Sequence, residues 1–175
     1  MSRSLVTLKR ALSVLAAAAL IGGCQWAQTL IFGEPHDLKS RETLAKTKPG
    51  SKEALTAARE GAHIAFLEVK DYRRALFFYK YLVLYSDDEA ERLEAQKHLA
   101  EIYFERLTDY DQAVIEYNRL LQLPHDPKEN AHFRMNVAKS YFYLNKFAQA
   151  DAELDIVVRG NPTGQVFFDA NLLRA

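Results

Sequence analysis

The chain has 175 residues, enough for one domain with its own hydrophobic core. Its 23 Lys and Arg residues balance 23 Asp and Glu residues, which excludes a general electrostatic attraction to nucleic acid. Cys24 is the only cysteine, so an intramolecular disulfide is excluded as well.

The first 23 residues have the pattern of an export signal. Basic residues precede an apolar and small-residue run over 11–23. This run is shorter than the roughly 20 apolar residues of a membrane-spanning helix. It ends in Leu20-Ile21-Gly22-Gly23-Cys24, which resembles a bacterial lipobox. The resemblance implies a lipoprotein signal peptide over 1–23, cleavage before Cys24, and acylation of the Cys24 thiol.

The same resemblance implies a location. Two or more acyl chains hold a protein firmly on a membrane. In bacterial lipoproteins an aspartate after the cysteine favours the inner membrane, and Gln25 stands there instead. We therefore expect lipid anchoring through Cys24 on the periplasmic face of the outer membrane. The alternatives are an ordinary secretory signal with a chance cysteine and a buried N-terminal helix.

Residues 24–50 are predicted to be the lipid anchor and a tether. The segment has little periodic apolar pattern after Phe32, and Pro49-Gly50-Ser51 indicates a turn followed by a helix N-cap. The apolar stretch Trp26–Phe32 is expected either at the membrane surface or docked on the folded domain, which we expect over 51–175.

From residue 52 the apolar residues recur at helical spacing, and no strand pattern is convincing. Three segments are alike: 70–75, 108–113 and 145–150. Each has an aromatic residue three positions before an alanine, and the alanines are Ala75, Ala113 and Ala150. The alanines are 38 and 37 residues apart, which predicts a repeated unit of helix, tight turn and helix.

The units resemble the tetratricopeptide repeat (TPR). The pairs Leu99-Ala100 and Val137-Ala138 stand where that family has Leu-Gly, and in repeat one Ala62-His63 stands there. Repeat two has one extra residue, assigned to its turn over 105–109. We expect an all-α fold, an α-solenoid of about three TPR helix-turn-helix repeats (56–91, 93–128 and 131–164) with a partial fourth helix over 165–175. The alternative is a plain helical bundle with accidental spacing.

The resemblance implies that side chains of each first helix line a concave partner-binding groove. The positions carried over are Glu60, Ile64, Leu67, Glu68, Lys97, Glu101, Phe104, Glu105, His132, Met135, Lys139, Phe142 and Tyr143. Ordinary core packing is the alternative for Ile64, Leu67 and Phe104. A second candidate surface is Phe77 and Tyr81, which are expected to face the N-terminal segment or another protein.

No residue pattern indicates catalysis. His125 and His132 flank a loop, but two histidines without a third ligand are a weak metal site. Glu101 and Glu105 lie one turn apart, as on many exposed helical faces. Glycine-rich phosphate loops and nucleophile motifs are absent from the sequence. We expect no enzymatic activity, no metal and no cofactor.

Anchor, tether and repeats together resemble outer-membrane TPR lipoproteins, among them the BamD-like subunit of the β-barrel assembly machine. The resemblance implies a membrane-anchored periplasmic adaptor that binds protein partners of the cell envelope. The alternatives are an accessory lipoprotein of cell-wall or polysaccharide enzymes and a pilotin-like secretin assembly factor. Phe168 and Leu172 repeat the spacing of Phe133 and Val137. Because the last segment is too apolar for a solvated cap, we also expect either a partner or homo-oligomer contact there or a longer ancestral chain.

Overall fold

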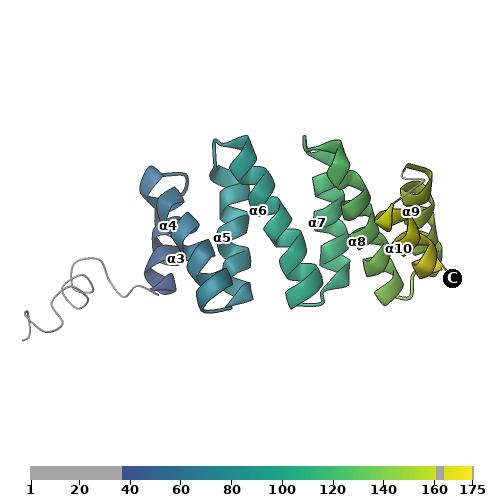
Figure 1. The fold of residues 1–175 in the computed structure, drawn as a ribbon. Helices are drawn as coiled ribbons and strands as arrows, with labels where there is room; N and C mark the ends of the chain where they lie inside the picture. The colour runs from purple at the N-terminus through teal and green to yellow at the C-terminus, as the bar shows by residue number, and fades with distance from the viewer. Residues whose placement is uncertain (1–36, 161–163, 175) are drawn as a thin grey trace, which may run out of the picture. The chain divides into compact units, whose positions relative to one another are not determined.

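The computed structural model describes residues 37–160 and 164–174 (Figure 1). The predicted signal peptide, Cys24 and the Trp26–Phe32 stretch lie outside the described residues. The fold below is that of the unit that begins at Leu38.

Eight α-helices and no strand are found among the described residues, which confirms the all-α prediction. The helices are α3 (Leu38–Thr47), α4 (Lys52–His63), α5 (Tyr72–Tyr85), α6 (Glu89–Glu101), α7 (Tyr110–Gln122), α8 (Asn130–Tyr143), α9 (Phe147–Gly160) and α10 (Gln165–Arg174). One-turn π-helices extend α4 and α6, namely η1 (Ile64–Glu68) and η2 (Ile102–Arg106), and a 3-10 turn, η3 (Pro127–Glu129), precedes α8.

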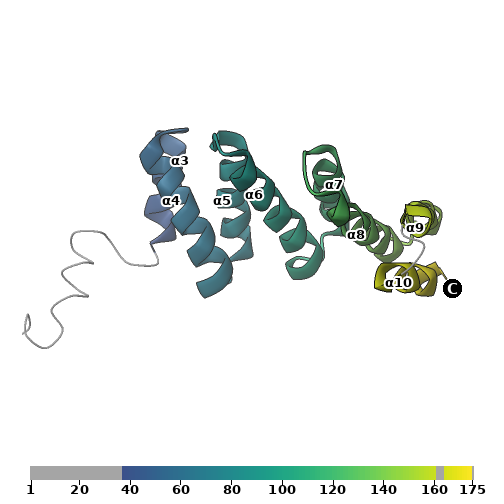
Figure 2. The ribbon, with the colours of Figure 1, turned by 45° about the horizontal axis from the view of Figure 1, so that its top comes forward.

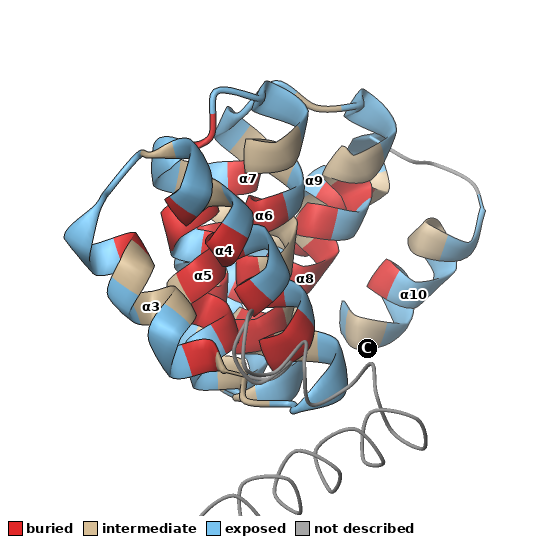
Figure 3. Ribbon diagram, turned by 90° about the vertical axis from the view of Figure 1, so that its left-hand side faces the viewer, coloured by how far each residue is buried: buried red, intermediate tan, exposed pale blue. Residues whose placement is uncertain are grey.

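The helices form a row of antiparallel hairpins. Each helix from α3 to α10 packs mainly against the one before it and the one after it, and the pairs α4/α5, α6/α7 and α8/α9 follow one another (Figures 1 and 2). Buried residues gather where neighbouring helices face each other (Figure 3). This arrangement confirms a helical-repeat fold with three complete hairpins.

The second helix of each hairpin carries the predicted apolar stripe. Its buried residues are Ala75, Tyr79 and Leu82 on α5, Ala113, Tyr117 and Leu120 on α7, and Ala150, Leu154 and Val157 on α9. The small alanine lets the two helices of a hairpin approach closely, and the two larger side chains cover the first helix. The stripe therefore holds each hairpin together at equivalent positions.

The turns inside the three hairpins share one backbone feature. One residue in each turn has a positive φ: Lys70 at 57°, Thr108 at 50° and Asn145 at 59°. In the first two turns the next residue, Asp71 or Asp109, caps the following helix by accepting a backbone N–H bond through its carboxylate. The turns are thus built alike although their sequences differ.

The extra residue lies in a π-helical turn, and repeat one has it too. The N–H of Val69 donates to Ile64 O and that of Leu107 to Ile102 O, each five residues back and at 2.9 Å. In repeat three the N–H of Leu144 donates to Ser140 O, four residues back. A π-turn takes up one additional residue without breaking the helix. The assignment of the insertion to the 105–109 turn of repeat two alone was therefore wrong.

The aromatic contacts correct the register of repeat one. The Phe66 ring lies 6.1 Å from that of Tyr79, and the Phe104 ring lies 6.2 Å from that of Tyr117, with interplanar angles of 77° and 78°. Phe66 is therefore the counterpart of Phe104, which sets a shift of 38 residues in the first helices. Under this shift Gly61-Ala62, and not Ala62-His63, corresponds to Leu99-Ala100.

Part of the predicted tether belongs to the folded unit. Helix α3 packs on α4 and buries Leu38 and Ala45, which are seven residues apart like Ala75 and Leu82 on α5. After α3, the backbone N–H of Gly50 donates to the Tyr81 hydroxyl at 2.8 Å. The prediction that the domain begins at residue 51 was wrong, because α3 covers α4 as a preceding second helix would.

Helix α10 stands where the first helix of a further repeat would begin, but it buries a different set of residues from the predicted one. Ala170 is buried, with Val166 and Leu173 packed beside it. Phe168 and Leu172 are 66% and 78% exposed, whereas their predicted counterparts Phe133 and Val137 are buried. The predicted correspondence was wrong because the inward stripe of α10 is Val166, Ala170 and Leu173.

Candidate functional site

The candidate site is the face formed by successive first helices, which we call the first-helix face. The 38-residue shift assigns its positions in sets of three, one from each repeat: Arg59, Lys97 and Met135; His63, Glu101 and Lys139; Phe66, Phe104 and Phe142; Leu67, Glu105 and Tyr143. The predictions for repeats two and three lie on these positions, and His132 lies nearby on α8.

In repeat one the corrected register changes the assignment. Ile64 is buried in the core, and Glu60 points to α3, where its carboxylate lies 3.1 Å from the Arg41 guanidinium. Ile64 was therefore wrong as a groove residue, whereas Glu60 stays a predicted groove residue that is paired with α3. Leu67 is 55% exposed, and Glu68 lies 3.4 Å from the His63 imidazole.

In repeat two the charged residues are paired with one another. Lys97 Nζ contacts Glu94 at 3.0 Å and Glu129 at 2.8 Å. The hydrogen bond from Lys97 to Glu129 raises the pKa of this lysine. Glu101 and Glu105 both lie within 4 Å of the Arg106 guanidinium. Repeat two therefore presents fixed charges on this face.

In repeat three the face is aromatic. Phe142 is 40% and Tyr143 is 55% exposed, and the Tyr143 ring stacks on that of Tyr110 at 4.6 Å. Lys139 is half-buried beside them. Met135 stands at an equivalent position but is buried in the cluster that joins α8, α9 and α10, so it was wrong as a groove residue. Large aromatic side chains that are exposed to solvent are typical of protein-binding surfaces.

A cleft opens between α4 and α6, and we call it the α4–α6 cleft. Its volume is about 310 Å³, and it is open to solvent along the first-helix face. Apolar and aromatic residues make up most of its lining: Ala62, Phe66, Leu67, Tyr79, Leu82, Ala95 and His98. The second helix α5 supplies the floor through Tyr79 and Leu82.

An ion pair closes one side of the cleft. The Arg59 guanidinium donates to both oxygens of Glu91, at 2.6 and 2.8 Å, and Glu91 also accepts from the Ser86 hydroxyl. The hydrogen bond from Arg59 lowers the pKa of Glu91 and raises that of Arg59. The bidentate pair joins α4 to α6 along this side of the cleft.

Three rings line the opposite side. The His98 ring stacks on Tyr79 at 4.6 Å and lies 5.3 Å from Phe66. The Nδ1 atom of His98 is buried and makes no hydrogen bond within the described part of the chain, while a Glu101 carboxylate oxygen lies 3.5 Å away. Burial, with a smaller contribution from the charge of Glu101, raises the pKa of Tyr79 to about 12. Tyr79 is therefore neutral at physiological pH.

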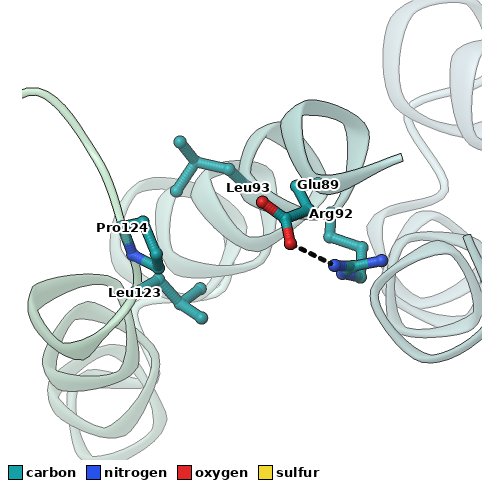
Figure 4. A pocket seen from close by; sticks show the side chains of 5 residues that line it. All are labelled: Glu89, Arg92, Leu93, Leu123 and Pro124. Carbon is teal, nitrogen blue, oxygen red and sulfur yellow. Dashed lines mark ion pairs between the residues drawn. The ribbon is translucent and has the colours of Figure 1, made fainter. Parts of the chain in front are cut away.

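Two further cavities lie elsewhere. One, of about 360 Å³, lies between the end of α3 and α5, where Lys46 Nζ is 5.0 Å from the Phe77 ring centre. Tyr81, predicted to face outward, is buried at its edge. The other, of about 250 Å³, separates Leu93 and Glu89 on α6 from Leu123 and Pro124, and Arg92 is paired with Glu89 at 3.6 Å (Figure 4).

The two candidate metal ligands are engaged separately. The imidazole of His125 bonds to Leu123 O and to the Asn130 side chain, while His132 lies 3.2 Å from the Asn136 amide. No group of three or more His, Cys, Asp or Glu residues is placed to hold a metal ion in the described ranges 37–160 and 164–174. Within the same ranges, no helix is both long and apolar enough to cross a membrane.

Sequence reasoning missed Arg59, His63 and Phe66 as face residues and Tyr79 and His98 as cleft residues. The signal that could have found them is the shared spacing of Phe66 to Tyr72 and of Phe104 to Tyr110, which sets the 38-residue shift. In comparisons with known proteins, no family model, no curated protein and no solved structure matches the chain.

Proposed function

We propose that the chain is a lipid-anchored adaptor on the periplasmic face of the outer membrane, which binds protein partners of envelope assembly through its first-helix face. The observation that carries this proposal is the exposure of Leu67, Phe142 and Tyr143 on that face. Large apolar side chains at such positions are candidate anchors for a partner, because burying each of them in a contact is favourable.

The charges on the same face suit recognition. Lys97 donates hydrogen bonds to Glu94 and Glu129, so its position is set before a partner arrives. Fixed charges around apolar anchors select a partner and orient it. The face offers paired charges and exposed rings, which favours binding over a chemical step.

The anchor is proposed from the sequence. Cys24 and the lipobox-like residues before it support lipidation, and α3 begins at Leu38. An extended chain spans at most about 3.3–3.6 Å per residue, so the segment between Cys24 and α3 would keep the folded unit within about 50 Å of the membrane. Such a short distance suits an adaptor that works at the membrane surface.

Site-specific photo-cross-linking in the native host tests the proposal. A photoreactive phenylalanine analogue is placed at Leu67 or Tyr143, with Ile115 as the control because it is 43% exposed on the second helix α7. We expect Leu67 and Tyr143 to cross-link one envelope protein in common, and Ile115 not to. Equal cross-linking from all three positions, or none from any, contradicts the proposal.

The identity of the cross-linked protein separates the alternatives. A β-barrel assembly protein supports the assembly adaptor, and a secretin supports the pilotin-like role. A wall synthase or hydrolase supports the accessory role.

A further inference from the structure

The α4–α6 cleft has a counterpart one repeat later that is filled. The 38-residue shift places Phe133 of α8 at the position of Ala95 of α6, and Tyr117 at the position of Tyr79. Phe133 is 3% exposed, and its ring lies 6.2 Å from that of Tyr117. The chain therefore supplies its own aromatic ring between α6 and α8.

Between α4 and α6 no phenylalanine stands at this position, and the α6 ring that packs on Tyr79 is that of His98. Ala95 has only a methyl group, so this part of the cleft stays open beside the His98 ring, which stacks on Tyr79 at 4.6 Å. Phe66 and His98 make the walls, and the distances of 6.1 and 4.6 Å to the Tyr79 ring are those of favourable aromatic contacts. The cleft therefore has the lining that an incoming aromatic side chain needs.

The charges near the cleft favour a cationic neighbour for that ring. The cleft is lined by the carboxylates of Glu91 and Glu94 and by the guanidinium of Arg59, which pairs with Glu91. Glu94 is also 63% exposed at the mouth of the cleft, where it can reach an incoming group. A basic residue beside the ring complements this excess of negative charge.

We propose that the α4–α6 cleft binds an aromatic side chain from a partner segment that carries a basic residue next to it. The bound ring takes the place that Phe133 occupies one repeat later. This inference rests on the proposed partner-binding role of the first-helix face, and it names the chemistry that one part of the face selects.

The test uses N-acetyl-phenylalanyl-lysinamide as a probe in NMR titrations of the chain. We expect millimolar binding that shifts the amide signals of Phe66, Tyr79 and His98, because a single side chain gives modest affinity. N-acetyl-alanyl-lysinamide should leave these signals in place. Equal shifts with both probes, or none with either, overturn the proposal.

Two variants locate the site. Ala95→Phe places the repeat-three residue in the cleft, and we expect at least about a tenfold loss of probe affinity, because the introduced ring competes for the same space. Ile115→Phe on α7 is the matched control and should bind as the unchanged chain does. If Ala95→Phe keeps its circular dichroism spectrum and melting temperature and still binds the probe unchanged, the proposal is overturned.

The second variant does not alter the core. Glu94→Lys changes an exposed charge at the rim and should weaken binding of the lysine probe about two- to fivefold, the range of an exposed ion pair. N-acetyl-phenylalanyl-glutaminamide carries no charge and should respond less to this change. An unchanged lysine-probe affinity overturns the basic-residue part of the proposal, whether or not Ala95→Phe folds.

These outcomes are distinguishable from failure of the proposed function. A partner cross-linked at Leu67 and Tyr143 together with no probe binding removes the cleft and leaves the adaptor role. Probe binding blocked by Ala95→Phe without any cross-linked partner keeps the cleft and removes the adaptor role.

Discussion

Position 61 is a glycine because the ring of Phe78 lies where a Cβ atom would be. A Cβ placed there would be 2.5 Å from the ring Cζ atom, and Phe78 is fully buried. The equivalent residues in the next two repeats are Leu99 and Val137, which face no such ring on their second helices: Glu116 and Glu153 replace Phe78 there. One large residue on α5 therefore determines which residue α4 tolerates.

We predict that Gly61→Ala destabilises the chain. The higher helix propensity of alanine is worth about 1 kcal/mol, but overpacking against a buried ring costs about 1–3 kcal/mol. Urea unfolding should show a net loss, and Phe78→Leu in the same chain should recover part of it. Gly160→Ala is the control, because no described atom outside its own helix turn lies within 4 Å of its Cβ position. A Gly61→Ala chain as stable as the original contradicts this packing.

Tyr79 gives a second prediction at the residue scale, a loss of stability at alkaline pH. Its pKa is about 12 in the folded chain and about 10 when unfolded. Below pH 10 both states hold the proton and the contribution to stability is complete. Between pH 10 and 12 the unfolded chain releases the proton first, so the free energy of unfolding falls by at most about 1.4 kcal/mol per pH unit. Tyr79→Phe should show a shallower decline in urea unfolding over this range, and identical declines would contradict the assignment.

At the scale of elements, α3 acts as the second helix of a preceding repeat. Leu38 and Ala45 are buried on α4, and Arg41 pairs with Glu60 of α4. Helix α3 thereby covers a side of α4 that would otherwise face solvent, as the terminal elements of repeat proteins do.

We predict that Leu38→Ala lowers the free energy of unfolding by about 2–5 kcal/mol, the usual cost of truncating a buried leucine. Lys39→Ala, at an exposed position of the same helix, is the control and should change little. Chemical denaturation measures both. If the two variants are equally stable, α3 is a tether and not part of the core.

The elements also show what could be predicted from the sequence. The second helices were predicted well because an alanine, a larger residue four positions later and an apolar residue three beyond it recur without interruption, as in Ala75, Tyr79 and Leu82. The first-helix register of repeat one was missed because the π-turns add a residue to repeats one and two, which a comparison based on a regular helix does not include. Helix α3 was missed because only two buried apolar positions mark it.

The candidate site was predicted less completely than the fold. Repeats two and three supplied Glu101, Phe104, Phe142 and Tyr143 at positions that the structure places on the first-helix face. The α4–α6 cleft was not predicted, because it depends on a difference between repeats: Ala95 is small where Phe133 is large. A repeat alignment shows what units share, whereas a cleft arises where one unit departs from the others.

At the scale of the whole molecule, we propose a lipid anchor joined to a helical-repeat binding scaffold. Cys24 lies outside the described residues, and its role remains a prediction from the sequence. We predict that the unchanged chain fractionates with the outer membrane and that Cys24→Ser does not, because the acyl chains provide the attachment. Globomycin should increase the apparent size by blocking cleavage of the signal. Unaltered fractionation and size contradict the anchor.

Binding of the partner by the first-helix face can be measured with purified proteins. The partner identified by cross-linking is titrated by calorimetry into the chain from residue 37 onward, unchanged or with Leu67→Asp and Tyr143→Asp together, with Ile115→Asp as the control. We predict at least about a tenfold weaker Kd for the double variant, since a charge on each apolar anchor opposes its burial, and an unchanged Kd for Ile115→Asp. An unchanged Kd for a folded double variant, or a loss confined to Ile115→Asp, would contradict the account.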